Sequence, residues 1–141
     1  SYIWASARDL LTRRAVMLDH EVFIYPVDIT DEQERALLGN LLRRTESLET
    51  TPRYYNTILS NCTNELAKAA GFSWAPAYIL TGRSDEYLFR RGIIPGASFD
   101  QAHARSDMTE FVQALNVTPA AVFDSALLAE LRRRNGISAP G

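Results

Sequence analysis

The sequence predicts an α+β fold that is mainly helical, with four to six helices and one or two strands. Helix-start signals recur along the chain, as capping residues placed three positions before Gln or Glu or directly before proline. One stretch, Glu21 to Asp28, is rich in β-branched and aromatic residues and predicts a strand. With 141 residues, 46% of them hydrophobic, we expect a single domain over residues 1–141 with a flexible tail at 136–141.

The N-terminal part leaves two interpretations open before the predicted strand. Tyr2 to Trp4 could close a strand, and Ala7 to Val16 could form a short helix or an extended crossing segment. Within the strand from Glu21 to Asp28, Pro26 lacks a backbone donor. The strand is therefore expected either to lie at the edge of a sheet or to end at Pro26.

A long helix is predicted after the strand. Thr30 is a suitable N-cap, and Gln33 stands three residues later, as in a capping box. Apolar residues then follow at helical spacing until Thr50-Thr51-Pro52 breaks the pattern. The residues of this apolar stripe are Ala36, Leu37, Leu38, Leu41, Leu42 and Leu48.

The middle of the chain is less regular. Residues 53–59 read as extended, and Asn61 is a good N-cap for a brief helix that Gly71 would end. Residues 72–78 are aromatic and irregular.

Further helices are predicted in the last third of the chain. Gly92 is expected to stop the first of them, and Thr118-Pro119 is an N-cap followed by proline at the first helical position. The predicted ranges are Ser84 to Arg91, Asp107 to Leu115 and about Ser125 to Arg134. The apolar residues expected to face the core in the last two helices are Phe111, Val112, Leu115, Leu127, Leu128 and Leu131.

Bulk composition excludes several function classes. A net charge of -2 with scattered arginine pairs argues against a nucleic-acid partner. One cysteine, two distant histidines and no Gly-rich phosphate loop predict neither a metal site nor a cofactor. No apolar run is long enough to span a bilayer. Because the chain starts at Ser1 without a signal peptide, we expect a processed chain or a fragment.

Cys62 is the main candidate for chemistry. With Asn61 as N-cap, Cys62 would lie in the first helical turn, where the helix dipole favours a thiolate. A buried structural cysteine is the alternative. A nucleophilic cysteine needs a base, normally histidine. Only His20 and His103 could serve within this chain, and each is most simply interpreted as a solvated surface residue.

Several segments in this order resemble a known family. They are Val22 to Val27, Ile29 to Gln33 before the Leu-rich helix, Pro52 to Asn56, Asn61-Cys62-Thr63, and Leu88 to Ile94. Together, over about residues 8–115, they resemble the Lnb N-terminal periplasmic domain family. That family is similar to circularly permuted papain-like proteins, including NlpC-type hydrolases and lecithin retinol acyltransferase-like enzymes. The resemblance implies that this chain is the C-terminal part of such a domain.

The resemblance also implies a reaction. Cys62 would be the nucleophile that forms a thioester, with Asn61 or nearby backbone N–H groups stabilising the oxyanion. The implied reaction is lipoprotein N-acylation in the bacterial periplasm or envelope, with a phospholipid or lipoprotein as partner and acyl donor. The residues expected to bind substrate are Tyr54, Tyr55, Asn56 and Trp74.

One part of the family pattern is missing. The Gly-His-x-hydrophobic segment that supplies the base should lie upstream of Ser1 and does not occur in these 141 residues. We expect either a fragment, completed by an upstream segment or a second chain, or a member that has lost its base. The alternatives to an enzyme are a non-catalytic binding module with an aromatic groove and a purely helical interaction domain.

Overall fold

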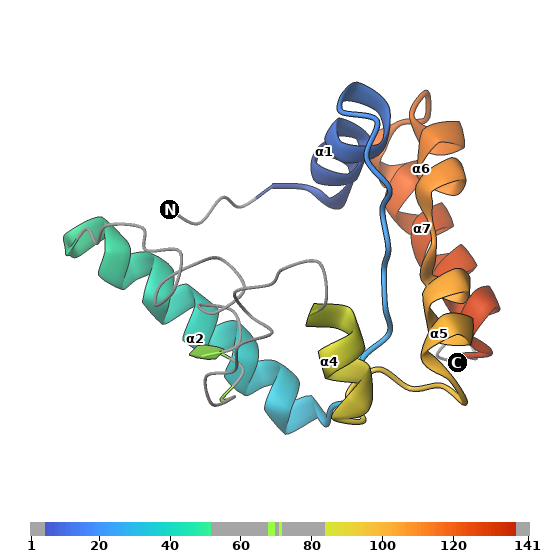
Figure 1. Ribbon diagram of the computed structural model, residues 1–141. Helices are drawn as coiled ribbons and strands as arrows, with labels where there is room; N and C mark the ends of the chain where they lie inside the picture. Colours follow the sequence, from blue (N-terminus) through green and yellow to red (C-terminus); the bar gives the residue numbers. More distant parts are fainter. Residues whose placement is uncertain (1–4, 52–67, 70, 72–83, 138–141) are drawn as a thin grey trace. The chain divides into compact units, whose positions relative to one another are not determined.

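A computed structural model describes residues 5–51, 68, 69, 71 and 84–137 (Figure 1). These residues form six α-helices and one short π-helix. The chain divides into two compact units. Unit 1 comprises Ser1–Tyr2 and Val27–Ile94, and unit 2 comprises Ile3–Pro26 and Pro95–Gly141.

The long helix of unit 1 is α2, Asp31–Thr50, and its predicted start is confirmed. The Thr30 hydroxyl accepts a hydrogen bond from the Gln33 N–H at 3.2 Å, and the Gln33 side chain accepts one from the Thr30 N–H at 2.8 Å. Both orphan donors at the helix start are thereby satisfied. The helix ends at Thr50, and its C-cap, Thr51, directly precedes Pro52.

The apolar stripe of α2 is narrower than predicted. Leu37, Leu41 and Leu48 are half-buried, whereas Leu38 and Leu42 are each 51% exposed. No described residue of α2 is fully buried.

Two glycines of unit 1 lie where the sequence predicts helix ends. Gly71 has φ +79°, and Gly92, just after α4 (Ser84–Arg90), has φ +73°. Both values fall in the left-handed region that glycine adopts without steric cost. Beyond Gly92, the Ile93 carbonyl accepts a hydrogen bond from the Asp28 N–H at 2.9 Å, and Ile94 is buried.

Unit 2 is a helical cluster. Its first helix, α1 (Ala7–Thr12), continues as a π-helix, η1 (Arg13–Met17). The helical alternative for residues 7–16 is therefore the one the chain adopts. Three more helices follow Pro95: α5 (Phe99–Ser106), α6 (Thr109–Leu115) and α7 (Ala120–Asn135). In Figure 1, α5 and α6 run one after the other beside α7, and α1 packs against α6 and α7.

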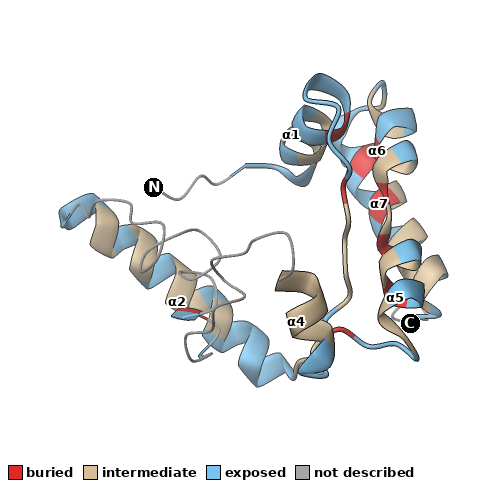
Figure 2. Cartoon of the chain, viewed as in Figure 1, coloured by how far each residue is buried: buried red, intermediate tan, exposed pale blue. Residues whose placement is uncertain are grey.

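The core of unit 2 forms where these helices meet, and Figure 2 shows its buried positions on η1, α6 and α7. Its buried members are Ala15, Val22, Met108, Val112, Phe123 and Leu127. Phe111, Leu115 and Leu131 pack against it, as the helical spacing predicts. Leu128 was expected to point inward but is 47% exposed.

The predicted strand at residues 21–28 is wrong. The segment is extended, but among the described residues it makes only one isolated β-bridge, between Phe23 and Asp107. The backbone hydrogen bonds of Val22 and Ile24 in this segment go to the junction of α5 and α6. The Ile24 N–H donates to the Ser106 carbonyl at 2.8 Å, and the Met108 N–H donates to the Val22 carbonyl at 2.9 Å. A helix junction satisfies the backbone in place of a neighbouring strand, so the described residues are helical without a sheet.

The helix starts in the last third also differ from the prediction. α5 was not predicted, although Ser98 and Gln101 form its cap, with the Ser98 hydroxyl accepting from the Gln101 N–H at 3.3 Å. α7 begins at Ala120 with Pro119 as its N-cap, five residues earlier than predicted. Thr118 does not cap it, because its hydroxyl donates to the Leu115 carbonyl at 2.7 Å.

Candidate functional site

Most of the residues predicted to form the site lie outside the described residues. Cys62, the predicted nucleophile, falls in 52–67. The others in undescribed ranges are Asn61, Tyr54, Tyr55, Asn56 and Trp74. The two histidines, by contrast, are both described.

His20 lies on the surface of unit 2. It is exposed and follows Asp19, whose φ of +51° turns the chain sharply after η1. The His20 N–H donates to the Arg14 carbonyl at 2.9 Å, which fixes the backbone of this turn. The surroundings of the imidazole are therefore those of a solvated residue.

His103 lies within an aromatic cluster of unit 2. The His103 cluster comprises Phe23, Tyr25, Phe99 and His103, all half-buried. The imidazole stacks on the Phe23 ring with 4.1 Å between centroids and 18° between planes. The Phe99 ring lies at 5.5 Å, tilted by 34°. The imidazole of His103 is thus half-buried among aromatic rings, and the prediction that it is solvated is wrong.

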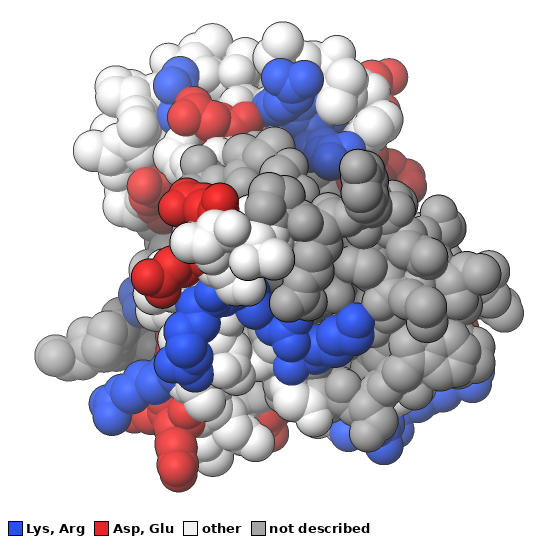
Figure 3. Space-filling view, turned by 90° about the vertical axis from the view of Figure 1, so that its left-hand side faces the viewer, with Lys and Arg blue, Asp and Glu red and all other residues white. Residues whose placement is uncertain are grey.

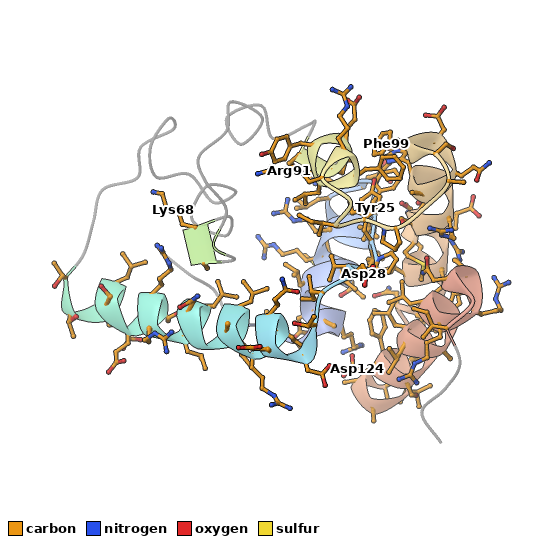
Figure 4. The ribbon with its side chains drawn as sticks, turned by 90° about the horizontal axis from the view of Figure 1, so that it is seen from below. Tyr25, Asp28, Lys68, Arg91, Phe99 and Asp124 are labelled. Atoms are coloured by element: carbon orange, nitrogen blue, oxygen red, sulfur yellow. The ribbon has the colours of Figure 1, made fainter. Side chains whose placement is uncertain are left out.

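Tyr25 supplies a polar contact of the His103 cluster. Its hydroxyl lies 2.5 Å from Nδ1 of His103 and forms a hydrogen bond with it. A phenol can donate to or accept from an imidazole nitrogen, so this contact can select the tautomer of the ring. The pair can thus hold a proton at a defined place. Figure 4 shows the side chains of this part of the chain, with Tyr25 and Phe99 labelled.

Local structure explains how these side chains meet. Phe99 and His103 are four residues apart on α5, so they share one face of that helix. Phe23 and Tyr25 are two residues apart in the extended segment, so they point to the same side. The backbone of this segment is fixed to the α5–α6 junction by the hydrogen bonds of Val22 and Ile24 described above.

Asp107 lies one helical turn beyond His103. Its carboxylate accepts a hydrogen bond from the Thr109 N–H at 3.0 Å and thereby satisfies the start of α6. Hydrogen bonds from the Thr109 backbone and hydroxyl lower the pKa of Asp107, and the charges of Arg134 and His103 lower it further. Arg134 also donates to the Asp107 carbonyl, which ties α7 to the same junction.

A second group of charges lies near the end of α7. Glu130 pairs with Arg133 at 2.6 Å and with Arg134 at 2.7 Å. Hydrogen bonds from these two arginines lower the pKa of Glu130 to about 2. This network matches a helix C-terminus, where arginines favour the negative end of the dipole. Figure 3, a view of the left-hand side of Figure 1, shows both basic and acidic side chains among the described residues.

The described residues contain no group of three or more His, Cys, Asp or Glu side chains that could hold a metal ion. None of the described helices has both the length and the apolar character needed to cross a membrane.

The sequence contained a signal for the His103 cluster that our prediction missed. Ser98 and Gln101 have capping-box spacing, which would have predicted α5 and placed Phe99 and His103 on one face. The pairing with Tyr25 has no such signal, since the two residues are 78 positions apart.

A comparison with protein families covers the first part of the chain. The family model described as the Lnb N-terminal periplasmic domain matches residues 1–85, which include Cys62 and Tyr25 but not His103. No curated protein and no solved structure matches the chain. Because the match covers more than half of the 141 residues, it establishes the family and its periplasmic location. The chain belongs to the Lnb N-terminal periplasmic domain family.

Proposed function

We propose that this domain carries out thiol-dependent acyl transfer or hydrolysis, with Cys62 as the nucleophile. The observation that carries the proposal is the family match over residues 1–85, which includes Asn61-Cys62-Thr63. The sole cysteine of the chain thus lies in the matched range, directly after a residue suited to cap a helix. Such a position favours the thiolate form that a nucleophile requires.

The proposed reaction has two steps. A base takes the thiol proton of Cys62, and the sulfur attacks the carbonyl carbon of an acyl ester. The C–S bond forms as the C–O bond breaks, and the alcohol leaves with a proton. An amine then attacks the thioester to give an amide and the free thiol, and water in place of the amine gives hydrolysis.

Two groups of residues would support this reaction. Asn61, or backbone N–H groups at the start of the helix, would stabilise the oxyanion that forms during each attack. The aromatic and polar residues nearby in the sequence would bind the acyl donor. These residues are Tyr54, Tyr55, Asn56 and Trp74.

The substrate class rests on the finer resemblance to permuted papain-like enzymes of the NlpC and lecithin retinol acyltransferase types. By that resemblance, a phospholipid donates the acyl chain and the terminal amine of a lipoprotein accepts it. The periplasmic location of the family supports this choice, because both partners occur at the membranes that border the periplasm.

The base is a histidine in this proposal, with His20 as the first candidate in the chain and His103 as the second. Loss of a general base lowers a rate by about 10²–10⁴-fold. We therefore compare labelled acyl transfer by His20→Ala and His103→Ala with transfer by the unaltered protein. A loss of this size in one variant identifies the base, and full activity in both excludes the two histidines.

Alkylation of Cys62 tests the nucleophile without knowledge of the substrate. We expect the rate of reaction with iodoacetamide to rise with a midpoint below pH ~8.5, the value of an ordinary thiol. Cys62→Ser is the control for reaction at other side chains. A midpoint at or above that of a free thiol would contradict an activated nucleophile.

The alternative function is a non-catalytic binding module that uses Tyr54, Tyr55 and Trp74 as an aromatic groove. It predicts an ordinary thiol and binding that survives Cys62→Ser. The alkylation profile therefore separates the two functions in a single experiment.

A further inference from the structure

The two methionines of the chain have opposite surroundings. Met17 is 75% exposed, whereas Met108 is fully buried in the core of unit 2. Oxidation of a thioether depends on access to its sulfur, so Met17 should be oxidised more readily than Met108.

Met17 lies at the end of η1, where the chain turns toward His20. Its neighbours Val16 and Leu18 are also exposed, at 40% and 44%. Met108 instead lies between α5 and α6, and its N–H donates to the Val22 carbonyl at 2.9 Å. An oxidant in solution can therefore reach the sulfur of Met17 directly, whereas it can reach the sulfur of Met108 only when the core opens.

We propose that Met17 is an oxidation site of this protein, modified by two-electron oxygen donors such as hydrogen peroxide. A lone pair on the sulfur attacks one peroxide oxygen. The S–O bond forms as the O–O bond breaks, so the sulfur is oxidised by two electrons and the peroxide is reduced to water. The periplasm is an oxidising compartment, in which such a site is chemically relevant.

The position of Met17 decides the effect of the modification. Methionine sulfoxide is polar and disrupts apolar cores. At Met17 the added oxygen faces solvent and leaves the core contacts in place, whereas at Met108 it would lie in the core beside Val112 and Phe123. The chain can therefore be oxidised at Met17 while unit 2 stays folded. This inference does not depend on the proposed acyl transfer.

Peptide mass spectrometry after treatment of the full chain with hydrogen peroxide tests the proposal. In the folded protein we expect Met17 to gain one oxygen atom at least about tenfold faster than Met108, because Met108 reacts only when the core opens. In guanidinium chloride the two methionines should react at similar rates. Near-ultraviolet circular dichroism should not change when Met17 alone is oxidised.

Two matched variants complete the test. Met17→Leu should abolish the fast oxidation, and Met108→Leu, a similar-volume change in the core, should leave it intact. Equal oxidation rates for the two methionines in the folded protein would overturn the proposal. Loss of tertiary structure on oxidation of Met17 alone would overturn it as well.

Discussion

Tyr25 and His103 form a hydrogen bond inside an aromatic cluster. The hydroxyl and Nδ1 lie 2.5 Å apart, and the rings of Phe23 and Phe99 pack against the imidazole. Both partners are half-buried, so neither is fully hydrated if the other is removed. The contact therefore contributes to the stability of unit 2.

Tyr25→Phe should lower the free energy of unfolding by about 0.5–1.5 kcal/mol, the usual range for one hydrogen bond. Urea unfolding monitored by circular dichroism measures the change. His20→Ala is the control, because a substitution at an exposed position changes stability by no more than about 0.5 kcal/mol. Equal stabilities of Tyr25→Phe and the unaltered protein would contradict a stabilising contact.

Asp107 gives a prediction for pH. Hydrogen bonds from Thr109 lower the pKa of Asp107 below the ordinary 3.8. The charged carboxylate of Asp107 therefore stabilises the folded state. This contribution is complete above the unfolded value and is lost as the pH falls through the lowered folded value. Asp107→Asn should therefore be less stable than the unaltered protein at pH 7, and the difference should shrink below about pH 3.8.

Urea unfolding of Asp107→Asn at a series of pH values measures this effect. Asp124→Asn removes the same charge from an exposed position of α7 and serves as the control. A stability difference that stays constant down to pH 2 would show that the Asp107 charge makes no contribution.

Among the elements, α2 shows which signals can be predicted from sequence alone. Its capping box joins residues only three positions apart, so the local sequence is sufficient to determine it. Gly71 and Gly92 are equally local, because a left-handed backbone favours glycine whatever surrounds it. These predictions hold because they need no distant partner.

Elements that depend on distant partners could not be predicted in the same way. The segment at 21–28 has the composition of a strand, but its backbone partners are Ser106 and Met108 at a helix junction. Composition describes a residue's fit to a half-buried surface and not the identity of the partner. For the same reason, the contact of Tyr25 with His103 could not be predicted, while Cys62 stands out from local sequence alone.

Thr30→Ala tests the start of α2. Loss of the N-cap should destabilise unit 1 by about 1 kcal/mol, since the first N–H groups of the helix lose their partner. Thr50→Ala is a matched control within the same helix, because among the described residues the Thr50 hydroxyl bonds to carbonyls of the last turn. Thermal unfolding followed by far-ultraviolet circular dichroism compares them, and equal melting temperatures would contradict the capping role.

For the whole molecule, the residues matched by the family model are not the same as those that build the core of unit 2. The match ends at residue 85, but the core of unit 2 joins residues from both sides of that limit. Ala15 and Val22 come from the matched part, and Met108, Val112 and Phe123 come from beyond it. Residues after the match are therefore needed to bury apolar residues within it.

Phe123→Ala tests this dependence. Phe123 is fully buried, so its truncation should lower the stability of unit 2 by about 3–5 kcal/mol. Leu128→Ala, on the same helix but 47% exposed, should change stability much less. Guanidinium unfolding of both variants measures the difference, and similar losses would show that α7 does not provide the core.

The most direct test of the proposed function is a search for the acyl group on Cys62. The full-length protein is incubated with a phospholipid that carries a labelled acyl chain and then analysed by intact and peptide mass spectrometry. Our account predicts a labelled thioester on the peptide that contains Cys62, released by hydroxylamine and absent from Cys62→Ser. No label on that peptide, or the same labelling in Cys62→Ser, would contradict Cys62 as the nucleophile.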